Sequence, residues 1–202
     1  NETCVWRYVP CTRDSDMSVT VTHVVALRAA RNVGIKVPQA TIDRALRYVI
    51  ESANTDPRGR YPVGSFLYQP YTQMFNRDSF ALTAAGLTTL FQAGLYDDAS
   101  MARYVESRGI DKRPAPRLAD IVTYMKETYR LMPDWHKDHY FFWYGAYYAT
   151  QAMYQLGVQD PETWAAWYRA LSKDILARQV RGPRGADGQP EAWWVSNVDD
   201  TN

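Results

Sequence analysis

The sequence predicts an all-α fold in which about three pairs of helices form an inner and an outer layer. The first observation is that Gly34, Gly94 and Gly157 lie 60 and 63 residues apart, each at the end of a helical stretch. The second is that an amphipathic helical stretch follows each glycine. The third is a composition of 46% hydrophobic and 14% aromatic residues over 202 residues, which suffices for the core of one domain.

The first helix of each pair is expected to lie in the inner layer. Its sequences, VVALRAARNVG, AAGLTTLFQAG and YATQAMYQLG, are apolar or small on most sides, as in helices covered by neighbours all round. Small residues recur in register at Ala26, Gly86 and Ala149. We expect these helices over residues 19–33, 80–93 and 141–156. Each should end in a left-handed glycine cap.

The second helix of each pair is expected to lie outside. In residues 39–52, which follow a proline, one stripe carries Ile42, Ala45, Leu46 and Val49. Matching helices are expected over residues 99–107 and 162–179. A repeat of about 60 residues is longer than the 33 to 47 residues of common helical solenoids, so it favours a layered ring.

The remaining segments fit between these pairs. Residues 117–131 predict a further helix, an insertion that decorates one rim of the ring. The links 54–77 and 182–202 are rich in glycine, proline and aromatic residues, and we expect surface loops or mobile tails there. The chain is therefore expected to be a single helical-repeat domain, with repeats at about 14–77, 78–138 and 139–195.

Charge and hydropathy exclude several classes. The 23 basic and 22 acidic residues nearly cancel, which gives no reason to expect nucleic acid as a partner. No apolar run approaches the length of a transmembrane helix. Cys4 and Cys11 either close a small disulfide loop or remain free thiols. The chain starts at Asn1 without an initiator Met, which suggests a processed protein or a fragment, and both an exported and a cytoplasmic location stay open.

The segment DMSVTVTHVVALRAARNVGIKVPQATIDRALRYV resembles a repeat of the squalene–hopene cyclase and prenyltransferase superfamily. Residues 173–179 followed by GADGQPEAWW resemble the end of such a repeat, and WRYVP at 6–10 resembles the end of a preceding one. The chain is most similar to short bacterial proteins built from these repeats. The resemblance implies an α/α toroid, or here a partial toroid with about half of the usual helix pairs.

The same resemblance implies a candidate acid. Class II terpene cyclases use an Asp-x-Asp-Asp motif whose middle aspartate protonates an alkene or epoxide in an aromatic cavity. The run Asp14-Ser15-Asp16-Met17 matches three of the four positions and places Asp16, with Asp14 beside it, at the acid. An aspartate directly before a helix is also an ordinary N-cap that accepts hydrogen bonds from the first free amides. We favour the cap.

The sequence also contains candidate residues for a metal site and for the lining of a central cavity. Prenyltransferases of this superfamily bind zinc through Asp, Cys and His, and neither cysteine here stands in a matching context, so no zinc or other cofactor is expected. His136, Asp138 and His139, with Asp134, form a cluster that could hold a metal, although a polar rim loop explains it equally well. His23, Trp143, Tyr144 and Tyr147 are candidates to line a central cavity, with packing as the favoured alternative.

Two functions follow from these patterns. The favoured one is a non-catalytic structural or interaction module, a subunit or fragment of a larger assembly. The alternative is a terpene-cyclase-like or isoprenoid-binding protein with Asp16 as proton donor. We expect the inner helices to bury their remaining faces against another protein chain or the missing part of the toroid. Residues 140–148 and the Trp193-Trp194 tail are the expected contact points. A hydrophobic small molecule is a further possible partner.

Overall fold

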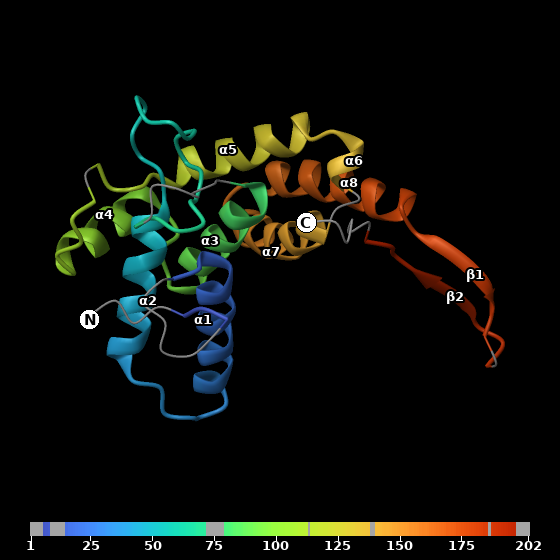
Figure 1. The fold of residues 1–202 in the computed structure, drawn as a ribbon, viewed down its shortest axis with the longest axis horizontal. Coiled ribbons are helices and arrows are strands. Elements are labelled where there is room, and N and C mark those ends of the chain that lie inside the picture. Colours follow the sequence, from blue (N-terminus) through green and yellow to red (C-terminus); the bar gives the residue numbers. More distant parts are fainter. Residues whose placement is uncertain are drawn as a thin grey trace. The chain divides into compact units, whose positions relative to one another are not determined.

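In a computed structural model, the chain is predominantly helical, as the sequence predicted (Figure 1). The structure describes residues 6–8, 15–71, 79–112, 114–137, 140–185 and 187–196. It divides into two compact units, an N-terminal unit (Asn1–Leu131) and a C-terminal unit (Met132–Asn202), which are considered separately below. The single-domain organisation and the ring of helix pairs therefore stay predictions.

The described residues of the N-terminal unit form five helices. They are α1 (Met17–Asn32), α2 (Gln39–Ser52), α3 (Phe80–Gln92), α4 (Asp98–Ser107) and α5 (Leu118–Leu131). Helices α1, α3 and α4 start at side chains that accept the free amide protons of the first turn, whereas α2 starts after Pro38 without such a cap. Ser79 caps α3 by accepting from the amide of Leu82 at 3.1 Å, and Asp97 opens α4 with a capping box.

Two of the three aligned glycines end their helices as predicted. Gly34 and Gly94 follow α1 and α3 with φ of 86° and 85°, a conformation that glycine adopts without strain. Beyond each glycine the chain bonds back into the helix. The amide of Ile35 donates to the carbonyl of Ala30 at 3.0 Å, and that of Leu95 to Leu90 at 3.1 Å. These are the six-residue bonds of a Schellman motif, which satisfy the last carbonyls of each helix.

Helix α3 is the most deeply buried element of the N-terminal unit. Every residue from Phe80 to Phe91 is buried, and the helix packs against α1, α2 and α5. The predicted burial of this helix on most sides is confirmed, whereas the inner and outer layers stay a prediction. Burial on most sides is wrong for the second half of α1, because the buried residues of α1 end at Val24 and both Ala26 and Ala29 are exposed.

Helix α5 is part of this core. It packs along α3 through Ile121, Met125 and Tyr129, and the Tyr129 ring lies 5.8 Å from that of Phe80. The expectation that this helix decorates a rim is wrong. A sequence period cannot distinguish an insertion outside the core from one that covers a buried helix, since both interrupt the repeat equally.

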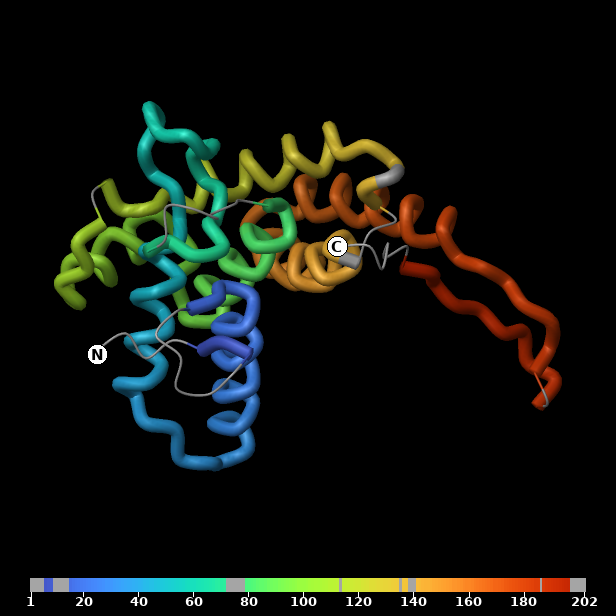
Figure 2. The backbone as a smooth tube through the Cα atoms, viewed as in Figure 1, coloured from blue at the N-terminus to red at the C-terminus, as the bar shows by residue number. Residues whose placement is uncertain are grey.

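The link after α2, drawn in turquoise in Figure 2, is also buried in part, which the sequence did not predict. Gly64 has a φ of +86° and touches the backbone of α5, where a Cβ atom would lie 2.4 Å from the carbonyl oxygen of Asp120. Two residues later, Phe66 is fully buried. The backbone amide of Phe66 donates to the hydroxyl of Thr83 on α3 at 3.0 Å, which fixes the link against that helix.

The C-terminal unit consists of α6 (Asp134–Lys137), α7 (Tyr140–Leu156), α8 (Pro161–Ala177) and a hairpin of β1 (Val180–Arg184) and β2 (Pro190–Trp193). Helices α7 and α8 pack on each other. The predicted left-handed cap at Gly157 is wrong: its φ is not positive, and its amide donates to Met153 at 3.0 Å as in a helix. Glycine is needed there for space, because a Cβ atom would lie 2.6 Å from Cβ of Trp164 on α8.

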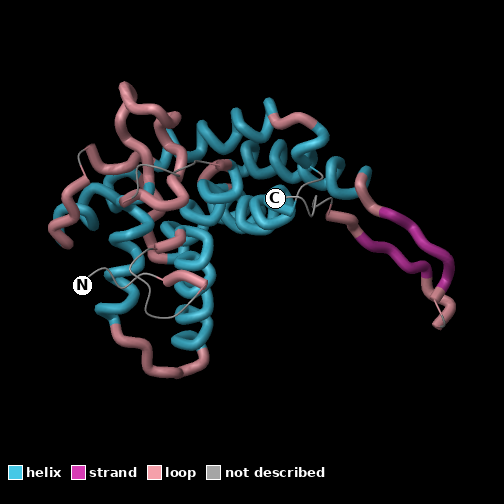
Figure 3. Tube along the Cα trace, in the orientation of Figure 1, coloured by secondary structure: helices cyan, strands magenta, loops and turns pink. Residues whose placement is uncertain are grey.

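The hairpin replaces part of the expected tail, and these are the only strands among the described residues (Figure 3). It is antiparallel, with Val180 opposite Trp193 and Arg184 opposite Pro190. Gly182 lies under the Trp193 ring, where a Cβ atom would come within 2.5 Å of Cζ3. At the turn, Gly188 has a φ of 76°. The Asp187-Gly188 pair is a hairpin signal that the sequence analysis missed.

Among the described residues, no helix has both the length and the apolar character needed to cross a bilayer.

We predict that Gly86→Ala destabilises the N-terminal unit by about 1–3 kcal/mol, because the new Cβ atom would lie 2.6 Å from Cδ1 of Phe66 in a filled core. Urea denaturation followed by circular dichroism measures the loss. The matched control is the same substitution in a Phe66→Leu background, where the smaller side chain should remove most of the penalty. Equal losses in both backgrounds would show that this contact does not limit the packing.

Candidate functional site

The candidate acid Asp16 lies directly before α1 and is fully buried. Backbone hydrogen bonds of Asp16 and of the next residue, Met17, join three segments of the chain. The amide of Asp16 donates to the carbonyl of Trp6 at 3.2 Å, and the amide of Met17 donates to the carbonyl of Tyr68 at 3.1 Å. The start of α1 is therefore bonded both to residue 6 near the N-terminus and to the link that follows α2.

The Asp16 carboxylate accepts four hydrogen bonds. Its Oδ1 accepts from the amide of Ser18 at 2.8 Å, the hydroxyl of Ser18 at 2.6 Å and the amide of Val19 at 3.2 Å. Its Oδ2 accepts from the hydroxyl of Tyr68. A carboxylate offers about four acceptor positions, so the surrounding donors occupy this one fully. Such pairing is what a buried acidic group requires, because an unpaired one would cost several kcal/mol.

Tyr68 responds to this environment. Burial, followed by the hydrogen bond and the charge of Asp16, raises the pKa of Tyr68 well above its ordinary value. Its hydroxyl therefore stays protonated throughout the physiological pH range and donates a hydrogen bond to Asp16. The carbonyl of the same residue accepts from the Tyr48 hydroxyl at 3.4 Å, so Tyr68 joins α2 to the start of α1.

These contacts favour a structural role for Asp16. A general acid needs an oxygen directed at a substrate, and both oxygens here face donors of the same chain. Met17, which stands where the cyclase motif has its last aspartate, is fully buried and belongs to the core. Asp14, the other candidate acid, lies outside the described residues, as do Cys4 and Cys11.

His23, a candidate for lining a cavity, lies on the exposed surface of α1. Its Nδ1 is 2.8 Å from the carbonyl oxygen of Val19 one turn earlier. Its ring stacks on that of Trp6, with a centroid distance of 5.0 Å and an interplanar angle of 10°. Both contacts are those of a packing residue that holds the N-terminal segment against α1.

The aromatic candidates on α7 contact other rings of the same helix. Trp143 meets Phe142 edge-on at 5.2 Å, and Tyr144 lies 4.8 Å from Tyr148. Tyr147 lies 5.0 Å from Tyr148 and keeps 61% of its surface exposed. Burial raises the pKa of Tyr148. These contacts lie within one helix, so both the lining of a central cavity and packing between repeats stay predictions.

The charged residues around α6 form ion pairs with α8. Lys137 lies 2.9 Å from Asp174, and Arg178 lies 3.4 Å from Asp134. His136 is half-buried, whereas Asp138 and His139 lie outside the described residues. Within the part of the chain that the structure describes, no group of three or more His, Cys, Asp or Glu side chains could hold a metal ion. The described part of this cluster thus links α6 to α8.

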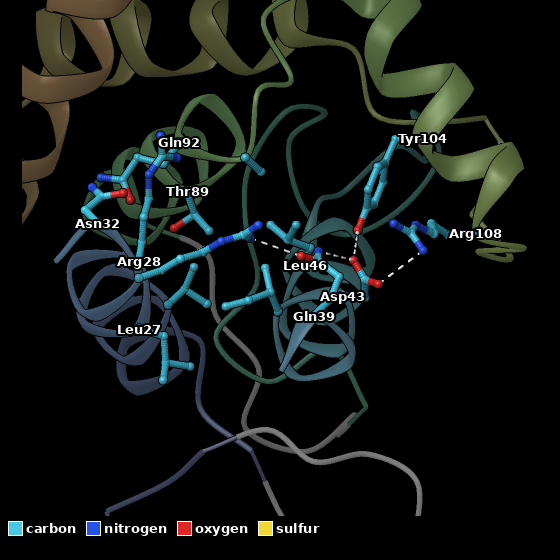
Figure 4. A pocket seen from close by; sticks show the side chains of 14 residues that line it. Leu27, Arg28, Asn32, Gln39, Asp43, Leu46, Thr89, Gln92, Tyr104 and Arg108 are labelled. Atoms are coloured by element: carbon cyan, nitrogen blue, oxygen red, sulfur yellow. Dashed lines mark hydrogen bonds and ion pairs between the residues drawn. The ribbon is translucent and has the colours of Figure 1, made fainter. Parts of the chain in front are cut away.

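A cavity of about 430 Å³ is the second candidate site (Figure 4). It lies in the N-terminal unit between the second half of α1, the first half of α2 and the ends of α3 and α4. Cavities of this size suit small molecules. Apolar side chains of Val24, Ile42 and Leu46 contribute to the lining, and the rest is mainly polar.

Among the described residues that line the cavity, Asp43 is the only acidic one, and it has three partners. Arg108 pairs with its Oδ2 at 3.1 Å, while Gln39 and Tyr104 donate to its Oδ1 at 3.1 and 3.4 Å. Arg31 in turn donates to Gln39 at 3.1 Å. This network joins α1, α2 and α4 along one side of the cavity.

The buried phenol of Tyr104 is a stable donor in this network. Burial, with a smaller effect of the nearby Asp43 charge, raises the pKa of Tyr104 to about 12. It therefore remains protonated at all pH values that a cell experiences. The sequence alone did not predict this site. Arg28 and Arg31, one turn apart before the aligned Gly34, are the only local signal, since most of the other lining residues come from α2, α3 and α4.

Comparison with known proteins found no matching family model, no matching curated protein and no matching solved structure. The resemblance to the squalene–hopene cyclase and prenyltransferase superfamily therefore stays a prediction.

We predict that Tyr68→Phe changes how stability depends on alkaline pH. Because the folded-state pKa of Tyr68 is raised, its contribution is fully present below pH ~10, the value for an unfolded tyrosine, and is lost as the pH rises further. Between about pH 10 and 11 the free energy of unfolding of the wild type should fall faster than that of the variant. The excess should be at most about 1 kcal/mol, because Tyr68 is partly exposed to solvent.

Urea titrations across this range measure the two slopes. The control is Tyr61→Phe, which removes a phenol outside the Asp16 contacts. Parallel curves for wild type and Tyr68→Phe would contradict a Tyr68–Asp16 bond that stabilises the fold.

Proposed function

We propose that this chain is a non-catalytic helical module that functions by assembling with protein chains, in the first place with a second copy of itself. The observation that carries the proposal is an exposed aromatic surface on the C-terminal unit. The full engagement of Asp16 with donors of its own chain supports the non-catalytic part, because the strongest acid candidate has no oxygen left for a substrate.

The surface begins on α7, a helix of 17 residues without one charged side chain. On one side of this helix, Tyr147 and Tyr154 lie seven residues apart, hence on the same face, with 61% and 64% of their surface exposed. Helices that face only water normally carry charged residues on that side. An exposed face without charge is typical of a surface that another protein covers.

The surface continues onto α8. Trp164 lies 5.5 Å from Tyr154 and 5.5 Å from Tyr168, and Tyr168 is 57% exposed. We call Tyr147, Tyr154, Trp164 and Tyr168 the aromatic face. Tyrosine and tryptophan supply much of the binding energy of protein interfaces, since they bury large areas at a small cost in side-chain entropy.

A second copy is the occupant that the charge pattern favours. In a twofold dimer the same surface contacts itself, and residues near the axis meet their own copies, so a charge there would be repelled by its copy. The uncharged α7 removes that repulsion, and tyrosine hydroxyls can both donate and accept across the interface. The Trp193-Trp194 tail is less suitable as a main contact. Trp193 covers Gly182, and Nε1 of Trp194 donates to the carbonyl of Ile175 at 2.8 Å.

The α/α-toroid arrangement belongs to the same proposal. Its support is the buried α3 and the two glycine turns, at Gly34 and Gly94, that join α1 to α2 and α3 to α4. A cyclase-like function with Asp16 as acid would require Tyr68 to leave Oδ2, and no contact in the described chain favours that change.

We predict that the purified chain forms a dimer that the double variant Tyr154→Ser/Tyr168→Ser weakens at least about tenfold in dissociation constant, because the central rings of the interface are lost. Sedimentation equilibrium over a concentration series measures it. Tyr96→Ser, which removes a 40% exposed tyrosine from the N-terminal unit, is the matched control and should leave the dimer unchanged.

Two outcomes would contradict this proposal. One is a wild-type chain that remains monomeric up to roughly 100 µM, because its self-association would then be weaker than a specific assembly requires. The other is a double variant that loses thermal stability but not its dimer, which would place the aromatic face inside the protomer.

A further inference from the structure

The cavity in the N-terminal unit has a charge imbalance that its own residues do not correct. Three arginines line it, Arg28, Arg31 and Arg108, against the single carboxylate of Asp43. Arg108 is paired with that carboxylate, and Arg31 contacts the neutral side chain of Gln39. Arg28, which is half-buried, has no hydrogen-bond or ion-pair partner among the described residues. Two guanidinium groups thus face the cavity without a carboxylate.

A buried acceptor lies at the same end. Oε1 of Gln92, at the end of α3, is buried and has no hydrogen-bond partner among the described residues. Leaving such an oxygen without a donor costs about 1–3 kcal/mol. The Gln92 side chain lines the cavity, so a rotation of its amide group would present Oε1 to a donor on a bound ligand and recover this cost. Figure 4 shows Arg28, Asn32 and Gln92 gathered at one end of the cavity, with Asp43, Tyr104 and Arg108 at the other.

The helix ends around the cavity have opposite electrostatic effects on an anion. Helix α2 begins at the cavity with Gln39, and its N-cap Pro38 provides no side-chain acceptor, so the positive end of its dipole adds to the arginines. Helices α1, α3 and α4 end at the cavity, and the negative ends of their dipoles oppose an anion. The turns at Gly34 and Gly94 satisfy some of the last carbonyls of α1 and α3, and the arginines supply the attraction for an anion.

We propose that this cavity binds a small organic anion, a carboxylate or a phosphate ester, that also carries a hydroxyl or amino group. Arg28 and Arg31 hold the anionic group, since a guanidinium matches the two oxygens of a carboxylate or phosphate. The hydroxyl or amino group donates to Oε1 of Gln92 and completes its hydrogen bonding. Asn32 beside it supplies a further donor and acceptor. The inference concerns the N-terminal unit and does not depend on the proposed assembly through α7.

Isothermal titration calorimetry with four probes tests the proposal. Glycerol 3-phosphate and glycerate carry an anion and hydroxyl groups, inorganic phosphate carries the anion alone, and glycerol carries the hydroxyl groups alone. We expect at least one of the first two to bind roughly tenfold or more tightly than inorganic phosphate, and glycerol not to bind measurably. The stronger of the first two identifies phosphate or carboxylate as the anionic group.

Matched variants locate the site. Arg28→Gln should weaken the tighter probe at least about tenfold, whereas Arg44→Gln removes the same charge from an exposed position of α2 outside the cavity lining and should not. Gln92→Leu should reduce the advantage of that probe over inorganic phosphate. If Gln92→Leu does not fold, as judged by circular dichroism, the Arg28 and Arg44 pair decides alone.

Three results would overturn the inference. The first is no binding of any probe. The second is equal weakening by Arg28→Gln and Arg44→Gln, which would indicate attraction by overall charge. The third is binding of inorganic phosphate as tight as that of both hydroxylated anions, which would leave Gln92 without a role.

Discussion

The buried carboxylate of Asp16 is the interaction on which the N-terminal unit depends. An acidic group with no exposed surface is tolerated only where donors replace the water it has lost. Here the donors come from the first turn of α1 and from Tyr68 in the link after α2, so the helix start and the link must be correctly placed at the same time. The carboxylate therefore couples segments about 50 residues apart.

That coupling places the rest of the link in the core. With Tyr68 held at the start of α1, Phe66 inserts beside α3 in the space left by the missing side chain of Gly86, and Gly64 lies against the backbone of α5. Two glycines and one phenylalanine thus join α3, α5 and the link. The same principle recurs in the C-terminal unit, where Gly157 makes room for Trp164 and Gly182 for Trp193. Close packing of glycine against large aromatic side chains is the common structural device of this aromatic-rich chain.

The sequence predicted those features that depend on local physics. Helix positions followed from apolar periodicity, and Asp16 was recognisable as a cap because an acidic residue before a helix accepts its free amides. The left-handed turns at Gly34 and Gly94 followed in the same way. Features set by tertiary contacts were not predictable. Nothing local distinguishes Gly157, which is required for space, from the other two glycines, and nothing in residues 54–71 shows that Phe66 is buried.

The candidate sites show the same difference between local features, which the sequence predicts, and tertiary features, which it does not. Local pattern identified Asp16 correctly as a cap, but its partner Tyr68 lies 52 residues away and has no sequence signal. The arginine-lined cavity was missed because its lining comes from four helices, each with an unremarkable polar residue. The aromatic residues of α7 were visible in the sequence. Which of them are exposed was decided by helix packing, which leaves Tyr147 and Tyr154 in solvent and buries Phe142 and Tyr148.

Asp16 both caps α1 and joins three segments of the N-terminal unit. The most direct measurement is the free energy of unfolding of Asp16→Ala compared with that of Ser79→Ala. Ser79 caps α3 through one hydrogen bond to the amide of Leu82, so its loss should cost about 1 kcal/mol. Asp16→Ala should cost roughly 3 kcal/mol or more, because it removes a cap and also leaves the hydroxyl of Tyr68 and buried amides without an acceptor. A loss for Asp16→Ala no larger than that for Ser79→Ala would contradict the claim.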